Sequence, residues 1–370
     1  MKTRRYTPLA LAAALAFAPL AVACSGGGGE DAQPAPPETT VPETTTTVVL
    51  STYPLTGLQT ADAAVAGNHA AVVVKVDNGI NSRPQTGVAQ ADIVFEEEVE
   101  GVTRLASVFH SQLPEVVGNV RSGRSSDIDI VAQLSRPLFA WSGGNPTVTR
   151  QILGAQNDGF LTDASYNVAT PAYYRSGDRK EPYNLYVHPG ELFDLTGTQE
   201  QGEPAPIFLY RKATDALPAT AVPVAGVTIS FTNAANVTYV WDAERKAWDR
   251  FQIDSQNGLE SSAFVDSDGP QVAPENVVVL KTPYGVSAAD KNSPQAFTVG
   301  EGEAMVFTGG AMIPGRWVRP DANGPVQLYD TVGTPIALTP GRTWVALPRD
   351  TRPVDLIDQP TADGFLAVRR

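Results

Sequence analysis

Runs of β-branched residues give the clearest periodic signal in the first half of the chain. Residues 71–76 read Ala-Val-Val-Val-Lys-Val and end at an Asp-Asn-Gly turn signal, which predicts a buried strand. Residues 93–99 and 103–109 flank a Glu-Gly pair and predict a hairpin. In that hairpin we expect Arg104 to face a glutamate across the two strands.

Two strand-to-helix transitions follow the predicted hairpin. Residues 116–120 and 138–141 have the apolar character of short strands. Each leads through a loop rich in serine and glycine into a helical pattern, at residues 127–134 and 147–153. This alternation of strands and helices predicts an α/β arrangement for residues 51–210.

Short strands dominate the chain beyond a Pro-rich boundary at residues 205–223. Gly, Pro, Asp and Asn separate them at the intervals typical of an all-β domain. We therefore expect an α+β, mixed fold, with an N-terminal α/β domain over residues 51–210 and a mostly β C-terminal domain over residues 220–370. The strands of the second domain are expected at residues 227–231, 237–241, 247–253, 276–281, 304–308, 315–318, 326–329, 335–338 and 343–347.

The N-terminus has the pattern of an exported lipoprotein rather than of a fold element. Three basic residues precede an apolar run at residues 9–20, and small residues precede Cys24. This pattern predicts a signal peptide over residues 1–23 and a lipid on Cys24. The run is shorter than the roughly 20 residues that cross a bilayer. Residues 24–50 are rich in Gly, Pro, Glu and Thr, and we expect a disordered tether there.

The charge of the chain argues against a nucleic-acid partner. Its formal net charge is −13, and removal of the three basic residues of the signal peptide takes it to −16. A polyanion would be repelled, and no Lys/Arg-rich run counters the repulsion. Membrane attachment is therefore expected through the two acyl chains of a diacylglyceryl group on Cys24, on the extracytoplasmic face of the cell membrane.

The two strand-to-helix loops predict an anion-binding crevice. We expect Ser125 or Ser126 to cap the first helix, and Asn145, followed by Pro146, to cap the second. If the two strands are neighbours, both helix N-termini open into one crevice beyond the strand ends. Paired guanidinium groups beside a helix N-terminus match a phosphate or a carboxylate. The expected ligand-binding residues are Arg104, Arg121, Ser122, Arg124, Ser142, Gly143, Gly144, Asn145 and Asn184.

Carboxylates in the same half allow three readings. Asp127 and Asp129 could simply neutralise the arginines, since acids are ordinary in a first helical turn. Asp77 or Glu96 could serve as an acid or base. The residues of the run 96–98 could also be solvated charges of an edge strand. A metal site is not expected, because no spacing matches a calcium loop.

Other catalytic signatures are missing from the sequence. His69, His110 and His188 are scattered and have no zinc-ligand spacing. The segment 142–144 lacks the Gly-x-Ser-x-Gly elbow, and the only cysteine is Cys24, the expected lipid site. We expect no cofactor, and a serine or cysteine hydrolase has no support.

Aromatic residues surround a polar loop near residue 180. The segments 173–175 (Tyr-Tyr-Arg) and 183–186 (Tyr-Asn-Leu-Tyr) flank it, and Arg179 lies within it. Aromatics interleaved with Arg175, Arg179 and Asn184 are what a groove for a glycan or an anion uses. They could equally be the packing of a lid.

Several ordered motifs resemble a known family. They are Lys75 to Asn78, Gln90 to Glu96, Gly101 to Leu105, Gly118 to Arg124, Asn184 to Tyr186, Gly310, Gly315 to Trp317, Tyr329-Asp330, Gly333 and Pro340 to Trp344. Together they resemble the YerB-like lipoproteins, a bacterial family of unknown function. The resemblance implies a two-domain, envelope-anchored lipoprotein linked to cell-wall assembly, without an established reaction.

Two positions depart from the family pattern. That pattern reads Ser-Ala-Arg in the first loop and Pro-His-Asn-Leu-Tyr near residue 184. Here Gly123 stands in place of the alanine and Tyr183 in place of the histidine. The second departure weakens any mechanism that uses a histidine acid at that point.

Three functions stay open from the sequence. The leading one is a non-catalytic binding protein for an anionic cell-wall component, such as a cell-wall glycan, or for a cell-wall protein. The second is an envelope hydrolase or transferase that acts on a phosphodiester or a glycan. The third is a scaffold whose β domain docks a membrane-bound cell-wall synthase.

Overall fold

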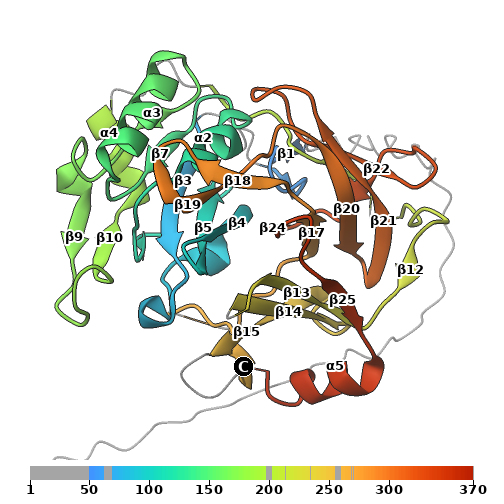
Figure 1. Cartoon of the computed structure of the whole chain (residues 1–370). Helices are drawn as coiled ribbons and strands as arrows, with labels where there is room; N and C mark the ends of the chain where they lie inside the picture. The colour runs from blue at the N-terminus through green and yellow to red at the C-terminus, as the bar shows by residue number, and fades with distance from the viewer. Residues whose placement is uncertain are drawn as a thin grey trace, which may run out of the picture. The chain divides into compact units, whose positions relative to one another are not determined.

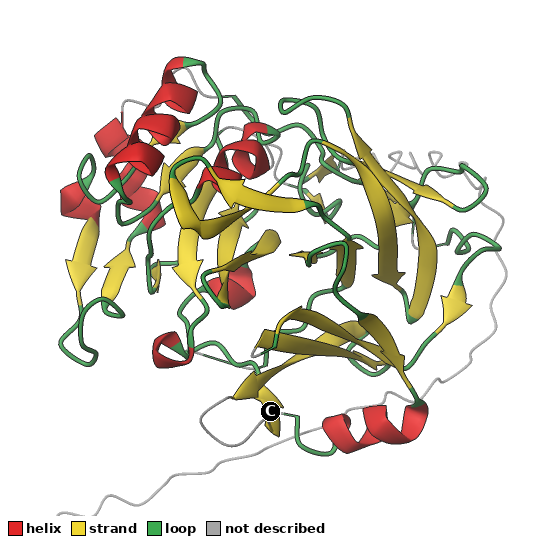
Figure 2. Ribbon diagram, viewed as in Figure 1, coloured by secondary structure: helices red, strands yellow, loops and turns green. Residues whose placement is uncertain are grey.

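The computed structural model describes residues 50–61, 69–196, 202–212, 214–233, 235–254, 260–267, 269 and 271–369. The expected signal peptide, Cys24 and nearly all of the expected tether lie outside these residues. Contacts group residues 48–370 into one compact unit. Figures 1 and 2 show that strands dominate it and helices are few.

One mixed sheet of eleven strands is built from both halves of the chain. Its spatial order is β12-β21-β20-β17-β24-β4-β5-β3-β7-β8, and β22 pairs with β21 off this path. The strands are β3 (Val72–Asp77), β4 (Ile93–Val99), β5 (Val102–Phe109), β7 (Leu138–Ala140), β8 (Thr162–Asp163), β12 (Val222–Pro223), β17 (Asn276–Leu280), β20 (Gly300–Thr308), β21 (Ala311–Arg319), β22 (Gln327–Asp330) and β24 (Thr343–Leu347).

The two halves meet in the middle of this sheet, where β24 pairs with β4. The pairing is parallel and runs from Thr343 opposite Ile93 to Leu347 opposite Glu97. Strands from both sides of the expected boundary at residues 205–223 therefore share one hydrogen-bonded sheet. The other neighbour of β4 is β5, and the predicted hairpin is confirmed, with Arg104 directly opposite Glu97.

Smaller sheets complete the β structure. A five-stranded antiparallel sheet has the order β16-β15-β14-β13-β25, and a three-stranded sheet has the order β6-β10-β9. Their strands are β6 (Val117–Gly118), β9 (Tyr173–Arg175), β10 (Leu185–Val187), β13 (Gly226–Thr232), β14 (Ala235–Asp242), β15 (Ala247–Asp254), β16 (Glu260–Ala263) and β25 (Val354–Ile357). Three ribbons are β1 (Ser51–Thr52) with β2 (Gln59–Thr60), β11 (Leu209–Tyr210) with β23 (Ala337–Leu338), and β18 (Tyr284–Ser287) with β19 (Asp290–Ala296).

The helices start close to the predicted positions, with one correction. Helix α2 (Ser125–Ala132) is capped by neither serine: Arg124 is its N-cap, and its N–H donates to Oδ2 of Asp127 at 2.7 Å. Helix α3 (Pro146–Asn157) begins as predicted, because Oδ1 of Asn145 accepts from two N–H groups of its first turn. The other helices are α4 (Leu192–Thr196) and α5 (Gln359–Leu366), with four 3-10 turns at Ile80–Ser82, Val88–Gln90, Thr170–Ala172 and Pro189–Glu191.

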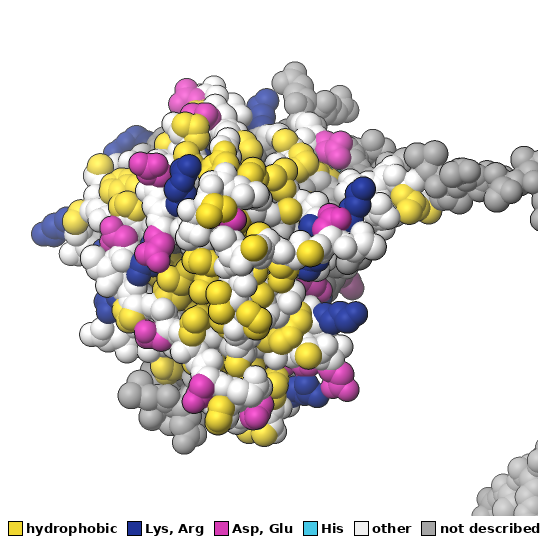
Figure 3. Space-filling model, turned by 90° about the vertical axis from the view of Figure 1, so that its right-hand side faces the viewer, with side chains coloured by type: hydrophobic (Ala, Val, Ile, Leu, Met, Phe, Trp, Pro, Cys, Tyr) yellow, Lys and Arg dark blue, Asp and Glu magenta, His cyan; other side chains and the backbone are white. Residues whose placement is uncertain are grey.

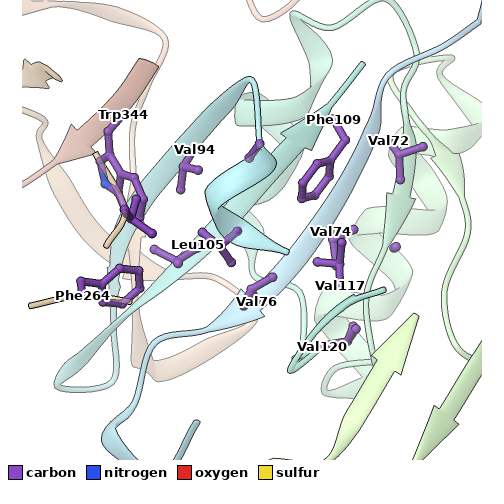
Figure 4. Close-up of a cluster of buried hydrophobic side chains, with 14 of the residues drawn as sticks. Val72, Val74, Val76, Val94, Leu105, Phe109, Val117, Val120, Phe264 and Trp344 are labelled. Carbon is purple, nitrogen blue, oxygen red and sulfur yellow. The ribbon is translucent and has the colours of Figure 1, made fainter. Parts of the chain in front are cut away.

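Two apolar layers cover the two faces of the large sheet. Val73, Phe95 and Val108 point to one face and pack with the apolar residues of α2 and α3. Side chains one position along each strand point to the other face, since side chains alternate. Figure 4 shows this second layer, in which Val94 and Leu105 lie near Phe264 and Trp344. The halves therefore share a core as well as a sheet.

Each strand predicted in the second half is confirmed, at least in part. The sequence missed β12, β16, β25, α5 and the β18–β19 ribbon. It also overestimated one strand of the first half: residues 116–120 form only the two-residue β6, in the three-stranded sheet. This strand and β7 therefore belong to different sheets, so the condition under which both helix N-termini would open into one crevice is not met.

Candidate functional site

Three consecutive glutamates of β4 are buried, which corrects their reading as solvated edge charges. Glu96, Glu97 and Glu98 are 0%, 1% and 7% exposed, because β4 is a central strand. Each has its own cation from another part of the chain. Glu96 pairs with Arg250 of β15, Glu97 with Lys75 of β3, and Glu98 with Arg349.

The side chain of Glu96 has no free position for a substrate proton. Its two oxygens accept from the side chains of Asn78 and Thr103 and from the indole N–H of Trp344, the last at 2.9 Å. Nη2 of Arg250 donates to both oxygens. The guanidinium of Arg250 also lies over the Phe264 ring, 3.9 Å from its centroid. This saturated arrangement gives no support to Glu96 as an acid or base.

A buried ammonium with two carboxylates lies on the helical face of the sheet. Nζ of Lys75 lies 2.5 Å from Glu97 and 2.6 Å from Asp127, and the exposure of all three residues is 1% or less. Burial raises the pKa of Asp127 from 3.8 to about 6, and the nearby charge of Glu97 acts in the same direction. Burial is the larger cause, and the Lys75 ammonium acts against it by lowering the pKa.

Two of the predicted arginines are held by carboxylates at the ends of the same strands. Nε of Arg121 donates to Asp77 at 2.6 Å. Arg124 forms a two-pronged contact with Glu100, through Nε at 2.9 Å and Nη2 at 2.6 Å. Oδ1 of Asp77 accepts from the N–H of Gly79, so both of its oxygens are engaged. Asp77 as a general base gains no support from this geometry.

Arg104 differs from its neighbours because no ion pair of the described residues includes it. The residue is 6% exposed, and Nη1 donates to the Ser122 carbonyl at 2.9 Å. Its Nε is buried and has no hydrogen-bond partner. Burial lowers the pKa of Arg104 to about 10, and repulsion from Arg124 contributes in the same direction. The charges of Asp77 and Glu100 act in the opposite direction, but neither carboxylate forms an ion pair with Arg104. An anionic ligand in contact with this nearly buried cation would stabilise it further.

Arg179 is a second cation of this region that forms no ion pair with any described residue. It donates from Nη1 to Oδ1 of Asn119 at 3.2 Å and from Nη2 to the Pro84 carbonyl at 2.7 Å. The amide Nδ2 of Asn119 is buried and has no hydrogen-bond partner. The ring of Tyr183 lies 5.4 Å from the guanidinium carbon of Arg121. We call Arg104, Arg121, Arg124 and Arg179 the guanidinium cluster.

Charge in this region is nearly balanced. Five bases face four acids, so the side-chain sum is one positive charge. The bases are the four arginines of the guanidinium cluster and Lys75, and the acids are Asp77, Glu97, Glu100 and Asp127. A strong local excess of positive charge is absent from the part of the chain described here, and selectivity for an anion would depend on Arg104 and Arg179.

The two predicted loops lie side by side although their strands do not pair. The N–H of Ser142 donates to the Arg121 carbonyl at 3.0 Å, and the N–H of Gly123 donates to the Gly143 carbonyl at 3.1 Å. Gly143 has φ +115°, which favours glycine. Asn145 uses its side-chain oxygen to cap α3, and Pro146 has no N–H. An anion at this helix end would have to displace the Asn145 cap.

The structure therefore brings together part of the predicted set. Arg104, Ser122, Arg121 and Arg124 share one region with Asp77. Ser142 to Asn145 border it through the loop contacts, and Gly144 is exposed. Asn184 is next in sequence to Tyr183 but accepts from Arg175 and donates to the Ser176 carbonyl. Lys75 and Asn119 were not among the predicted site residues. The sequence feature that could have identified them is that each is a polar residue within an apolar run.

Two hollows are described next, and the first shares Glu100 with this region. A polar groove of about 340 Å³ is bordered by the β18–β19 ribbon together with Glu98, Glu100 and Arg349. An apolar groove of about 280 Å³ is lined by Pro206, Ile207, Phe208, Leu209, Pro325, Val326, Gln327, Leu328, Tyr329, Pro335 and Ile336. Figure 3 shows hydrophobic side chains gathered in the middle of the face that includes β12 and β22.

Within the described residues, no helix is long and apolar enough to span a bilayer. The same residues hold no group of three or more His, Cys, Asp or Glu side chains placed for a metal ion.

Comparisons with known proteins agree over both halves. Residues 55–202 match the N-terminal domain of the family described as protein of unknown function DUF3048, and residues 227–345 match its C-terminal domain. The chain belongs to the DUF3048 family. This DUF3048 chain is 26% identical over 305 residues to the Bacillus subtilis protein named "Putative lipoprotein YerB", which covers 80% of this chain and 86% of the relative.

The fold of this DUF3048 chain also resembles a solved structure. The crystal structure of the YerB protein from Bacillus subtilis matches with a TM-score of 0.67 and 23% identity, over 82% of this chain and 99% of that one. The predicted family resemblance is thereby confirmed.

Proposed function

We propose that this chain is a lipoprotein anchored through Cys24 to the extracytoplasmic face of the cell membrane. There it binds, without catalysis, an anionic cell-wall component or a cell-wall protein through the guanidinium cluster. The lipoprotein name of the Bacillus subtilis relative supports the anchor. The N-terminal α/β domain remains part of this proposal as the half that carries the cluster.

One observation carries the binding role. Arg104 is 6% exposed, has an unpartnered Nε, and has no ion pair among the described residues. The charges of Arg121 and Arg124 lie near enough to Arg104 to lower its pKa. An anion bound there would supply the missing acceptor and offset the cost of burying the charge.

Calorimetry with inorganic pyrophosphate tests this role on residues 48–370, which form one compact unit. Arg104→Gln should weaken binding by about 10- to 100-fold, because a hydrogen bond to a charged group contributes roughly 1.5–3 kcal/mol. Added salt should weaken wild-type binding. Arg316→Gln is the matched control, since Arg316 is exposed and lies over Tyr329. Equal affinity of wild type and Arg104→Gln would refute the site.

The scaffold function has an observation of its own. The apolar groove is lined by residues of the β half together with Pro206 to Leu209 from the end of the N-terminal half. Leu209 is 58% exposed, and prolines and Tyr329 border the groove. A membrane-bound cell-wall synthase is the partner proposed here. Co-purification of the full-length lipoprotein with that synthase should be lost in Leu209→Asp and kept in Arg104→Gln. Retention in Leu209→Asp would exclude the groove.

A further inference from the structure

Two of the three histidines, scattered in sequence, meet where β3 begins and β5 ends. Val72 lies directly opposite Phe109 in the register of these strands, and the two side chains are neighbours in Figure 4. His69 comes three residues before Val72, and His110 directly follows Phe109. The ring centroids of the two histidines are 4.8 Å apart, and their planes differ by 44°.

The imidazole of His110 is buried without a hydrogen bond among the described residues. The residue is 1% exposed, and neither Nδ1 nor Nε2 has a hydrogen-bond partner. Burial is the main cause that lowers the pKa of His110 to about 4, and the charge of His69 acts in the same direction, whereas the His69 backbone raises the pKa. The ring is therefore neutral at pH 7, which is the form of histidine that binds metal ions.

His69 has the hydrogen bond that a metal-binding histidine makes with its other nitrogen. Its Nδ1 lies 2.8 Å from the Ala70 carbonyl. Because a carbonyl only accepts, Nδ1 carries the proton and the neutral ring keeps a lone pair on Nε2. Metal-binding histidines almost always donate their other N–H in this way, which fixes the orientation of the ring. His69 is half-buried, so solvent reaches the pair from its side.

The surroundings restrict the motion of both residues. The N–H groups of His110 and Ser111 each donate to Oδ2 of Asp92 at 2.7 Å. The ring of Phe193 in α4 lies edge-on to the His69 ring, with the centroids 5.4 Å apart. Ligands that are already held in place lose less conformational entropy when an ion binds.

The separation of the two rings fits one shared ion. Two imidazoles that bind an ion at about 2.0–2.1 Å, with an angle of about 90–110° at the ion, have ring centroids roughly 4.5–5.2 Å apart. The observed 4.8 Å lies within this range. Packing of the rings explains their contact, but it leaves both nitrogens of His110 without a partner. Imidazole nitrogens suit zinc, copper and nickel ions.

We propose that His69 and His110 bind one divalent ion of the late transition metals, with water completing its coordination. Structural zinc sites are closed by four protein ligands, whereas this pair leaves positions open to water or to a second ligand. The pair shares no residue with the guanidinium cluster, so the metal site does not rest on the proposed function.

Copper binding to residues 48–370, produced without a histidine tag, tests the site. This part of the chain lacks Cys24, so its three histidines are its strongest ligands for Cu²⁺. Calorimetry in excess Mg²⁺, which occupies sites made of oxygen alone, should detect one Cu²⁺ per chain. His69→Asn and His110→Asn should each weaken binding by more than about 100-fold, because loss of a ligand costs more than loss of the group that orients it. His188→Asn is the matched control and should bind Cu²⁺ as wild type does.

Electron paramagnetic resonance of the Cu²⁺ complex identifies the ligands. Hyperfine coupling to two imidazole nitrogens supports the site, whereas a spectrum of oxygen ligands alone would overturn it. Absence of wild-type binding, or equal affinity of His69→Asn and wild type, would also overturn it. Thermal unfolding checks that the variants fold, and the half-buried position of His69 keeps the test decisive if His110→Asn does not. Arg104→Gln should bind Cu²⁺ normally, so failure of the anion site and failure of the metal site are distinguishable.

Discussion

Single residues of this chain connect its halves through buried charge. Glu96 of β4 and Arg250 of β15 are both 0% exposed, and they are 154 positions apart in sequence. Trp344 donates to the same carboxylate. A buried pair of this kind is costly to break, because removal of one partner leaves the other charge without compensation.

Arg250→Met should therefore destabilise the protein strongly. Glu96 would keep its neutral donors but lose its cation, and the expected loss in the free energy of unfolding is about 3–5 kcal/mol. Urea unfolding followed by tryptophan fluorescence measures it. Arg316→Met, at an exposed arginine, should change the same quantity by less than about 0.5 kcal/mol. A loss below about 1 kcal/mol in Arg250→Met would contradict this account.

Sequence patterns located these residues but misjudged their surroundings. The run 96–98 looked like solvated edge charge because nothing near it in sequence indicates a second strand that pairs with it besides β5. That strand is β24, which begins at Thr343. Gly123 shows the same limit: a Cβ there would lie 2.7 Å from Cδ1 of Ile152 in α3. The same Cβ would lie 3.1 Å from Cε3 of Trp141, so a side chain at this position would require these neighbours to shift.

At the scale of elements, helix α2 begins on a titratable contact. Asp127 accepts from the N–H of Arg124 with one oxygen and from Lys75 with the other. Burial is the main cause that raises the pKa of Asp127, and Glu97 adds to it, while Lys75 and the Arg124 N–H lower it. The start of α2 and the buried charges below it are therefore one unit.

This unit predicts a pH effect with a definite sign. The pKa of Asp127 rises from 3.8 to about 6 on folding, so the folded state binds its proton more tightly. The contribution of this carboxyl to stability is greatest below pH 4 and is lost as the pH rises to about 6. Asp127→Asn keeps an acceptor for the Arg124 N–H and should unfold with a flatter pH dependence over that range.

Urea unfolding at several pH values provides the test, and the difference between variant and wild type isolates Asp127. The subtraction is needed because burial also raises the pKa of Asp249 to about 6. Parallel curves for Asp127→Asn and wild type between pH 4 and 6 would show that Asp127 does not titrate there.

Among the elements, the sequence was most reliable where local chemistry decides the structure. The Asn145-Pro146 start of α3 needed only residues within one turn. The β4–β5 hairpin needed only its own alternation and its Glu-Gly turn. The N-cap of α2 was missed because a distant strand, β19, engages Ser126 through the N–H of Ala296. Local signals cannot anticipate such contacts.

For the whole molecule, the shared sheet and shared core predict that the halves do not fold separately. Residues 48–210 alone would leave the β24 side of β4 unpaired and the apolar side chains of Val94 and Leu105 without Trp344 and Phe264. We expect this fragment to lack a cooperative thermal transition. Addition of residues 211–370 should restore one, as near-ultraviolet circular dichroism can show. Cooperative unfolding of the isolated fragment would contradict this view.

At this scale the sequence predicted the strand-rich second half and a mixed architecture, and the α/β character of the first half stays a prediction. It could not predict that β24 enters the middle of the sheet, because parallel pairing across 250 positions has no local signature. The candidate site followed the same rule. Arg121 and Arg124 could be predicted because both lie in one loop of the sequence. The contacts of Lys75 and Asn119 could not be predicted, because their partners are distant in sequence.

The place of β24 also sets an order of events during biosynthesis. A polypeptide emerges N-terminus first, so β4 is complete while β24 is still to be synthesised. Until β24 arrives, β4 is paired with β5 on one side only, and its other hydrogen-bonding edge is open. Open strand edges invite pairing with other chains. Protection of this nascent edge, by a chaperone or by delayed release, is therefore a requirement that the topology imposes on the cell.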